Sequence, residues 1–275
     1  MKVAIYFAVY KRLEILNICL DGIERLKKDH PDIDFIPFAV YSNLSEKNLL
    51  DRYGVRSLKH DNGYLGRKKN AGLKALMQLD WDYMMEIGSD DLINSKLIDV
   101  YRPLWEKGED AFGVRACYFI DAKTGRVAFW KHDYALGAGR CLRKGIFEGL
   151  GRRMKIRMKN SIPGAGKGKE LIFINAIAKM YTNPGIAELV EEINEPFGLW
   201  SDTENIALDG DSQFRLGTNG IHVKGLDLGE EVMVIDIKNG MNIHSFDKFK
   251  VCEKSEKEVL MDFSKKEQDG IWELR

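Results

Sequence analysis

The sequence predicts an α/β fold, with a mostly parallel central sheet flanked by helices and a small C-terminal appendage. Short apolar runs alternate with stretches of helical periodicity through the first third of the chain, and this order is typical of βαβ units. Apolar residues make up 44% of the 275 residues, which is enough for the buried core of such a sheet. The length allows one large domain or two small ones.

Strands and helices alternate regularly in the first third. The expected strands are apolar runs, and they cover residues 3–10, 35–41, 55–58 and 83–87. The expected helices have apolar residues three or four positions apart, and they cover residues 13–28, 46–53, 67–79 and 95–105. Polar clusters follow these strands. Because ligands of parallel sheets bind beyond the carboxyl ends of the strands, we expect the functional site there.

The rest of the chain is expected to complete the same domain. Residues 111–120 and 127–131 flank a turn signal at 121–125 and predict a hairpin. A further apolar strand is expected over 232–237, and helical spacing follows in the charged tail. The sequence shows no internal repeat and no low-complexity linker. We therefore expect one compact domain over residues 1–246 and a C-terminal helical tail over 247–275.

Charge is balanced overall but segregated locally. The chain has 42 Lys and Arg against 42 Asp and Glu, which argues against a generally basic nucleic-acid binder. Residues 139–169 nevertheless contain ten Lys or Arg and one acid, whereas residues 186–212 contain eight acids and no Lys or Arg. The two segments either neutralise each other or face different ligands.

The sequence predicts a cytoplasmic location. The apolar run at 3–10 is too short for a secretory signal, and no stretch is long enough to span a membrane. The four cysteines have no metal-like spacing, so reduced thiols are expected. Peripheral contact with a membrane surface remains open.

Two adjacent carboxylates, Asp90 and Asp91, follow the expected strand at 83–87. Ionised carboxylates at a buried strand end are unfavourable unless a cation binds them. Carboxylate oxygens suit Mg²⁺ or Mn²⁺, which share their coordination with substrate phosphates. A metal site is therefore expected here. The alternative is that one of these residues caps the next helix, a role for which Ser95 competes.

Five short motifs follow one another in order along residues 1–246. They are Val9-Tyr10-Lys11-Arg12 after the first strand, Asn62-Gly63 with Lys69-Asn70-Ala71-Gly72, Gly88-Ser89-Asp90-Asp91, Asp211-Ser212-Gln213-Phe214-Arg215-Leu216 with Gly220, and the stretch from Asp236 to His244. In this order they resemble the motifs of family 2-type glycosyltransferases with the GT-A fold, a Rossmann-like nucleotide-diphospho-sugar transferase fold. Gly88 stands where that family has the first Asp of its D-x-D motif.

The resemblance implies a role for each matching residue. It divides the domain into a nucleotide-binding half, 1–105, and an acceptor-binding half, 106–246. The residues implied at the nucleotide-sugar site are Ala8, Tyr10, Arg12, Asn62, Gly63, Arg67, Asn70, Ser89, Asp90 and Asp91. Asp90 and His244 would hold Mn²⁺ or Mg²⁺, and Asp211 would be the base that deprotonates the acceptor hydroxyl. Glu204 and Asp209 compete with Asp211 for that role.

The implied reaction is inverting transfer of a sugar from a nucleotide-diphosphate donor, with UDP as the expected nucleotide. The transition state is oxocarbenium-like. The metal neutralises the charge of the leaving diphosphate, and one carboxylate suffices as the base. The residues expected at the acceptor are Arg140, Arg143, Lys144, Arg152, Arg153 and Trp200. Trp200 is as readily a core residue.

The acceptor and two rival functions stay open. The acceptor is a glycan, a lipid-linked glycan at a membrane surface, or a modified DNA base gripped by the basic segment 139–169. A sugar-phosphate nucleotidyltransferase is one rival, although no glycine-rich loop follows the first strand. A non-enzymatic polyanion-binding protein is the other, and it leaves Asp90, Asp91 and Asp211 unexplained.

Overall fold

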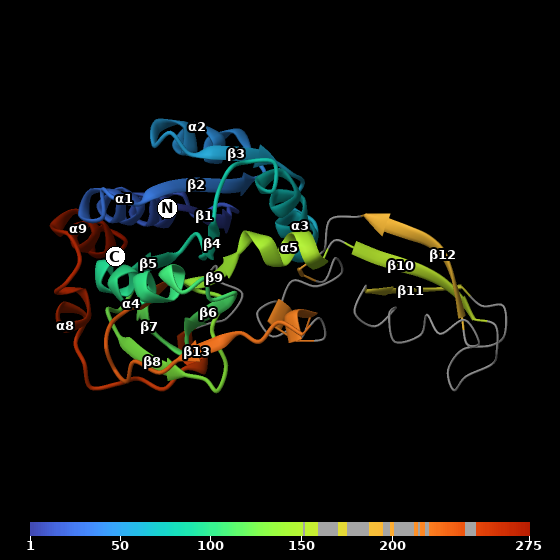
Figure 1. The fold of residues 1–275 in the computed structure, drawn as a ribbon. Helices are drawn as coiled ribbons and strands as arrows, with labels where there is room; N and C mark the ends of the chain where they lie inside the picture. Colours follow the sequence, from blue (N-terminus) through green and yellow to red (C-terminus); the bar gives the residue numbers. More distant parts are fainter. Residues whose placement is uncertain are drawn as a thin grey trace.

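The computed structural model describes most of the chain. It describes residues 1–147, 199–200, 212–213, 215–217, 220–239 and 246–275, and the backbone alone at 148–150, 152–158, 170–174 and 187–194. These residues form an α/β fold with a mixed central sheet flanked by helices, as predicted (Figure 1). Asp211 and His244, the expected base and second metal ligand, lie outside the described residues.

The central sheet has seven strands in the order β13-β6-β9-β4-β1-β2-β3. Their bounds are β1 Lys2–Ala8, β2 Asp34–Tyr41, β3 Arg56–Lys59, β4 Tyr83–Glu86, β6 Ala111–Val114, β9 Arg140–Arg143 and β13 Lys224–Leu226. The neighbours β4, β1, β2 and β3 are parallel, and β9 is antiparallel to both β4 and β6. The carboxyl ends of β1 and β4 therefore meet at one edge, where the site was expected.

A second sheet, in the order β5-β14-β7-β8, lies beside the first. Its strands are β5 Asp91–Ile93, β14 Val234–Lys238, β7 Ala116–Asp121 and β8 Val127–Lys131. The strands β7 and β8 form the predicted hairpin, with Gly125 at φ 70° in its turn. β14 pairs antiparallel with β5 and parallel with β7, so the late strand is inserted between elements that precede it by more than a hundred positions.

A third sheet brings the basic and acidic segments together. β10 (Arg152–Met158) lies between β11 (Glu170–Ile174) and β12 (Ala187–Asn194), and Figure 1 shows these strands to one side of the main body. The antiparallel register sets Lys155 opposite Glu191 and Arg157 opposite Glu188. Only the backbone of these strands is described, and its register places the basic and the acidic segment side by side.

Helices cover the sheets, and several of them begin at a side-chain cap. Their bounds are α1 Leu13–Asp29, α2 Leu44–Arg52, α3 Leu65–Leu76, α4 Ser95–Glu106, α5 Lys144–Leu150, the 3₁₀ turn η1 Phe246–Lys248, α8 Glu256–Leu260 and α9 Lys265–Glu273. Asn43 caps α2 in a capping box with Glu46, and Asn94 caps α4. The cap of α4 is thus neither Ser95 nor one of the carboxylates at 90 and 91, which removes the alternative role considered for them.

The C-terminal tail packs on helix α1. Arg25 of α1 forms an ion pair with the fully buried Glu267 of α9 at 2.8 Å, and Lys266 pairs with Asp21 at 2.6 Å. Arg25 also donates to the carbonyl of Ile93 in β5. The predicted appendage is therefore bound to the core by buried charge as well as by apolar contact. Within the described residues, no helix is long and apolar enough to cross a membrane.

Candidate functional site

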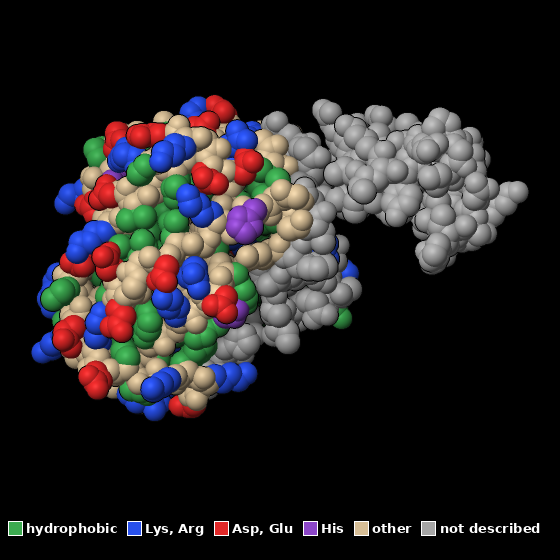
Figure 2. Space-filling view, turned by 60° about the horizontal axis from the view of Figure 1, so that its bottom comes forward, with side chains coloured by type: hydrophobic (Ala, Val, Ile, Leu, Met, Phe, Trp, Pro, Cys, Tyr) green, Lys and Arg blue, Asp and Glu red, His purple; other side chains and the backbone are tan. Residues whose placement is uncertain are grey.

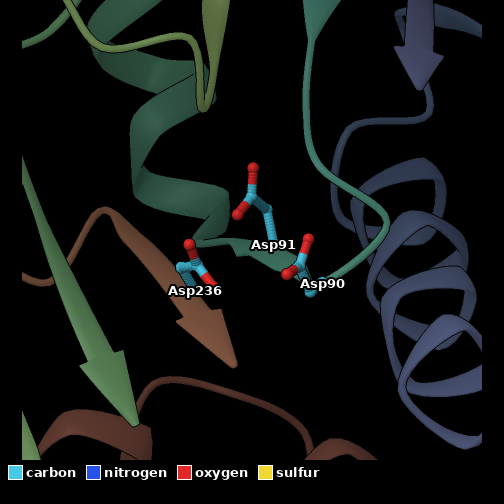
Figure 3. A group of neighbouring side chains, drawn as sticks. All are labelled: Asp90, Asp91 and Asp236. Atoms are coloured by element: carbon cyan, nitrogen blue, oxygen red, sulfur yellow. The ribbon is translucent and has the colours of Figure 1, made fainter. Parts of the chain in front are cut away.

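Three carboxylates meet at the carboxyl edge of the central sheet. Asp90, Asp91 and Asp236 each place an oxygen within 4.8 Å of the others (Figure 3). The register of β5 and β14 puts Asp236 directly opposite Asp91. A cavity of about 260 Å³ opens over them, and its walls include Ala8, Arg12, Lys69, Glu86, Ser89 and Lys238. The expected metal position at Asp90 is thus part of a larger acidic group.

The turn between β4 and β5 requires glycine at position 88. The amide of Gly88 donates to Asp91 Oδ2 at 2.5 Å, which folds the carboxylate back over the turn. A Cβ atom at this position would lie 2.6 Å from Asp90 Oδ1 and 3.1 Å from Asp91 Oδ2. In this arrangement the carboxylates of Asp90 and Asp91 fill the space that a side chain at position 88 would need.

Burial and neighbouring negative charge destabilise the ionised forms of Asp91 and Asp236. Burial, together with the charges of Asp236 and Asp90, raises the pKa of Asp91 well above its ordinary value. Burial and the charge of Asp90 raise the pKa of Asp236 to about 6. A cation bound between them would relieve both effects, because an opposite charge favours the ionised carboxylate.

Two basic side chains offset part of this charge. Arg12 donates to Asp90 Oδ2 at 2.6 Å and to Ser89 Oγ at 3.2 Å. Lys238 donates to Asp236 Oδ2 at 2.6 Å. Burial works against the charged lysine, but the charges of Asp236 and Asp90 outweigh it and raise the pKa of Lys238. The cluster thus combines acidic ligands with cations that phosphate oxygens could also contact.

The donor set fits a divalent metal ion. The other oxygen of Asp236, Oδ1, is buried and has no hydrogen-bond partner among the residues that the structure describes. A buried polar atom without a partner is unfavourable, and a metal ion would satisfy it. Three carboxylates form a hard oxygen donor set that suits Mg²⁺ or Mn²⁺.

The loop that carries Arg12 is held in an unusual backbone conformation. Lys11 and Arg12 lie in the left-handed region at φ 55° and 53°, which non-glycine residues adopt rarely. The buried carboxylate of Glu46 accepts from the amides of Lys11 at 2.6 Å and Ser42 at 2.7 Å. Lys68, also buried, donates to the carbonyl of Val9 and to the hydroxyl of Ser42. With this support β1 ends at Ala8, two residues before the end of the predicted strand, and Arg12 turns toward the carboxylates.

A buried charge network forms the cavity floor beside the cluster. Glu86, the last residue of β4, pairs with both Lys69 of α3 and Arg140 of β9, the latter at 2.7 Å. Arg140 also donates to Ser212 Oγ at 2.7 Å. Burial alone would raise the pKa of Glu86, but the charges of Lys69 and Arg140 dominate and lower it. The network connects the end of β4 to Ser212, the residue that follows Asp211 in the sequence.

The expected donor-site residues divide into two groups. Ala8, Arg12, Ser89, Asp90 and Asp91 all line the cavity. The other expected donor-site residues that the structure describes do not line the cavity. Tyr10 and Arg67 are exposed, and Asn62 and Gly63 lie in the exposed loop before α3. Asn70 faces Trp200. Asn70 Nδ2 donates to the backbone carbonyl of Trp200 at 2.7 Å, and the backbone amide of Trp200 donates to Asn70 Oδ1 at 3.1 Å.

The expected acceptor residues are not brought together. Arg140 and Trp200 are fully buried, so both serve as interior groups in this structure rather than as the surface contacts that were predicted. Arg143 pairs with Asp110, and Lys144 donates to the carbonyl of Leu79. Because β9 runs antiparallel to β4, Arg143 lies opposite Tyr83, at the far end of β4 from the carboxylates. Arg152 and Arg153 belong to β10, of which only the backbone is described.

Sequence reasoning missed Asp236, Lys238 and Glu86 as candidate site residues, and it named Lys69 only as part of a motif. A signal was present in the late strand, where Asp236 and Lys238 alternate with Ile235 and Ile237. Such alternation gives a strand one polar face, and two opposite charges on a face expected to be buried indicate a paired or ligand-binding role.

No protein-family model matches this chain, and no curated protein sequence matches it. Among solved structures it is similar to S. aureus TarS 1–349, with a TM-score of 0.47, 13% identity, and coverage of 86% of this chain and 60% of that one. The complex of TarS 1–349 with UDP-GlcNAc gives a TM-score of 0.45 at 14% identity, over 99% of this chain and 70% of that one.

A second kind of enzyme is also similar in fold. The 4-diphosphocytidyl-2C-methyl-D-erythritol synthase of Anaerococcus prevotii gives a TM-score of 0.40 at 13% identity, over 84% of this chain and 90% of that one. This chain spans about 60% of the length of the first TarS structure. At these identities the similarity concerns the fold alone, and function must be inferred from the residues of the site.

Proposed function

We propose that this chain is a glycosyltransferase that takes its sugar from a nucleoside-diphosphate donor, UDP in the first instance, and binds that donor with a divalent metal ion. The supporting observation is the group Asp90, Asp91 and Asp236 at the carboxyl ends of the parallel strands, with Arg12 and Lys238 beside it. Acidic ligands with adjacent cations suit a diphosphate bound through Mg²⁺ or Mn²⁺.

Each described residue has a distinct part in this proposal. Asp90, Asp91 and Asp236 would hold the metal ion, which supplies charge neutralisation for the leaving diphosphate. Arg12 and Lys238 orient two of those carboxylates and are close enough to the cavity to bind phosphate oxygens. Glu86, held between Lys69 and Arg140, fixes the end of β4 from which the acidic turn begins.

The acceptor side of the proposal rests on sequence. Asp211 would remove the proton of the acceptor hydroxyl as it attacks the anomeric carbon from the face opposite the diphosphate. A single base on that side predicts inversion at the anomeric carbon. Ser212, the next residue, is anchored to Arg140 and so to β4, which would hold the base near the donor edge.

Calorimetric titration with UDP, GDP, CDP and dTDP, with and without Mn²⁺, tests the donor half. We expect metal-dependent binding of one diphosphate, lost in Asp236→Asn and retained in Asp99→Asn, whose side chain is 67% exposed on α4. Binding that needs no metal, or that survives Asp236→Asn, would contradict the assignment.

An activity assay on the same protein distinguishes a glycosyltransferase from a nucleotidyltransferase. A nucleotidyltransferase requires a nucleoside triphosphate and a sugar phosphate and releases pyrophosphate, whereas a glycosyltransferase releases a nucleoside diphosphate from its donor. Incubation with each substrate set, followed by chromatography of the nucleotides, identifies the reaction. Pyrophosphate release would replace the proposed function by the nucleotidyltransferase alternative.

A further inference from the structure

One exposed tryptophan shares a sheet face with the acidic cluster. In the second sheet Asp91 lies opposite Asp236, and Asp236 lies opposite Phe119 of β7. Cys117, two positions before Phe119, lies opposite Trp130 of β8. Because side chains two apart on a strand point to the same side, Trp130 and Asp236 face the same side. Two strand spacings separate them across the sheet, roughly 10 Å.

Aromatic rings pack between the two, and Phe119 among them is buried. Lys238, which bonds Asp236, lies 4.9 Å from the centroid of Phe119. The Phe119 ring stacks on Phe249 with centroids 3.8 Å apart. Trp130 lies 6.2 Å from Phe119 and 6.0 Å from Phe249, and it remains 36% exposed. A row of packed aromatic rings therefore links Lys238 at the cavity wall to an accessible indole ring.

The rings of His132 and Trp130 meet in a corner, and these two residues are called the corner below. The two rings are 5.4 Å apart and nearly perpendicular, at 71°. His132 Nδ1 accepts the backbone amide of Asp133 at 2.9 Å, which fixes the ring and leaves the proton of the neutral imidazole on Nε2. The corner thus offers a flat apolar face beside an oriented N–H donor.

Two basic residues beside the corner, Lys131 and Arg115, are paired with acids. Lys131 forms an ion pair with Asp227 at 2.6 Å, and Arg115 pairs with Asp133 at 3.3 Å. Phosphate-rich ligands need a surplus of positive charge, which these pairs do not supply. A pyranose ring suits the corner better, since its C–H face stacks on an aromatic ring while its hydroxyl groups accept and donate hydrogen bonds.

We propose that Trp130 and His132 form a subsite for a sugar ring of a glycan acceptor. This inference rests on the proposed function, because it takes its direction from a donor sugar bound at Asp90, Asp91 and Asp236. The segment that follows the corner supports it, since Gly137 and Ala138 line the donor cavity. The subsite assigns to Trp130 the stacking role that was predicted for Trp200, which is buried.

Saturation-transfer NMR with the full chain tests the subsite directly. The probes are chitotriose, cellotriose and maltotriose, with a single-stranded DNA oligonucleotide as the competing class. The variants are Trp130→Ala, Trp130→Phe and His132→Ala, with Met261→Ala as the control because Met261 is 69% exposed beyond α8. UDP binding with Mn²⁺ is measured on every variant.

We expect at least one trisaccharide to bind, about tenfold more weakly to Trp130→Ala and within about threefold of the original affinity to Trp130→Phe. Met261→Ala should bind it unchanged, and UDP affinity should not change in any variant. Equal glycan binding by Trp130→Ala, or Trp130-dependent binding of DNA instead of sugars, would overturn the subsite.

The two proposals can fail separately. If UDP binds with Mn²⁺ but no trisaccharide does, the subsite is wrong and the donor site stands. If a trisaccharide binds through Trp130 but no nucleotide does, the proposed transferase function is wrong and the sugar-binding corner stands.

Discussion

Arg12 donates to Asp90 at 2.6 Å across the mouth of the candidate donor cavity, and it does so from a left-handed backbone position. The two residues are 78 positions apart and follow the neighbouring parallel strands β1 and β4. The guanidinium therefore acts as a counter-ion for a carboxylate that we expect to bind metal. A bound metal ion would compete with Arg12 for Asp90, whereas a diphosphate would be attracted by Arg12.

Replacing Arg12 should affect metal and nucleotide binding in opposite directions. In Arg12→Met we expect Mn²⁺ alone to bind as tightly as before or more tightly, because Asp90 loses its competing partner. UDP should bind about tenfold more weakly, since a charge-assisted contact to phosphate is lost. Calorimetry with each ligand measures both effects, with the exposed Arg56 changed to Met as control. A parallel loss of both affinities would contradict the competition.

Gly88→Ala should disable the acidic turn while leaving the fold intact. The added methyl group would lie 2.6 Å from Asp90 Oδ1 and push the carboxylates apart. We expect at least about a tenfold loss of metal-dependent nucleotide affinity. Gly145→Ala is the matched control, because no atom lies within 4 Å of the Cβ position there. The prediction is wrong if both alanine variants bind nucleotide and metal equally.

Glu86 should contribute stability that depends on pH. Its pKa is lowered from the ordinary 4.5 by Lys69 and Arg140, against the effect of burial. A lowered carboxyl pKa stabilises the fold above the unfolded value, and this contribution disappears as pH falls through the folded value. Glu86→Gln leaves two buried cations without their counter-ion, so we expect a loss of about 3 kcal/mol or more at neutral pH.

Urea unfolding between neutral pH and pH 3 measures this effect. The difference in free energy of unfolding between the original protein and Glu86→Gln should shrink as pH falls. Glu24→Gln, with a side chain 49% exposed, should show no such trend. A difference independent of pH would show that Glu86 is not ionised in the fold.

The tail should matter for the stability of the whole domain. Glu267 is fully buried against Arg25, which also bonds Ile93 in the strand that carries Asp91. We expect Glu267→Ala to lower the free energy of unfolding by about 3 kcal/mol, because the mostly buried guanidinium of Arg25 then keeps only its longer ion pair with Asp29, at 3.6 Å. Exposed Glu273 of the same helix is the control for this measurement by urea unfolding. Equal stabilities would mean that α9 is only loosely attached.

The fold was predictable where local patterns decide it. The β1–α1–β2–α2–β3–α3–β4 order follows from apolar runs and helical spacing, and the acidic turn at Asp90 and Asp91 follows from its place after a buried strand. The strand before Arg12 was predicted too long, because a carboxylate from α2, Glu46, ends it through contacts that are distant in sequence.

The rest of the site depends on long-range register. Asp236 joins the cluster only because β14 pairs with β5, and no local pattern specifies that partner. Arg140 was predicted at the surface from the charge of its segment, but Glu86 draws it into the interior. Both differences arise because burial of a charged side chain is determined by its partner, which the sequence places elsewhere.

The insertion of β14 between β5 and β7 also has a consequence for how the molecule comes into being. During synthesis the chain can assemble β1 to β4 and the acidic turn long before residue 236 leaves the ribosome, since those contacts are closer in sequence. A nascent or truncated chain that stops before β14 lacks the third carboxylate and Lys238. On the proposed function we therefore expect tight metal binding to arise last, and it would then report that the complete domain has closed.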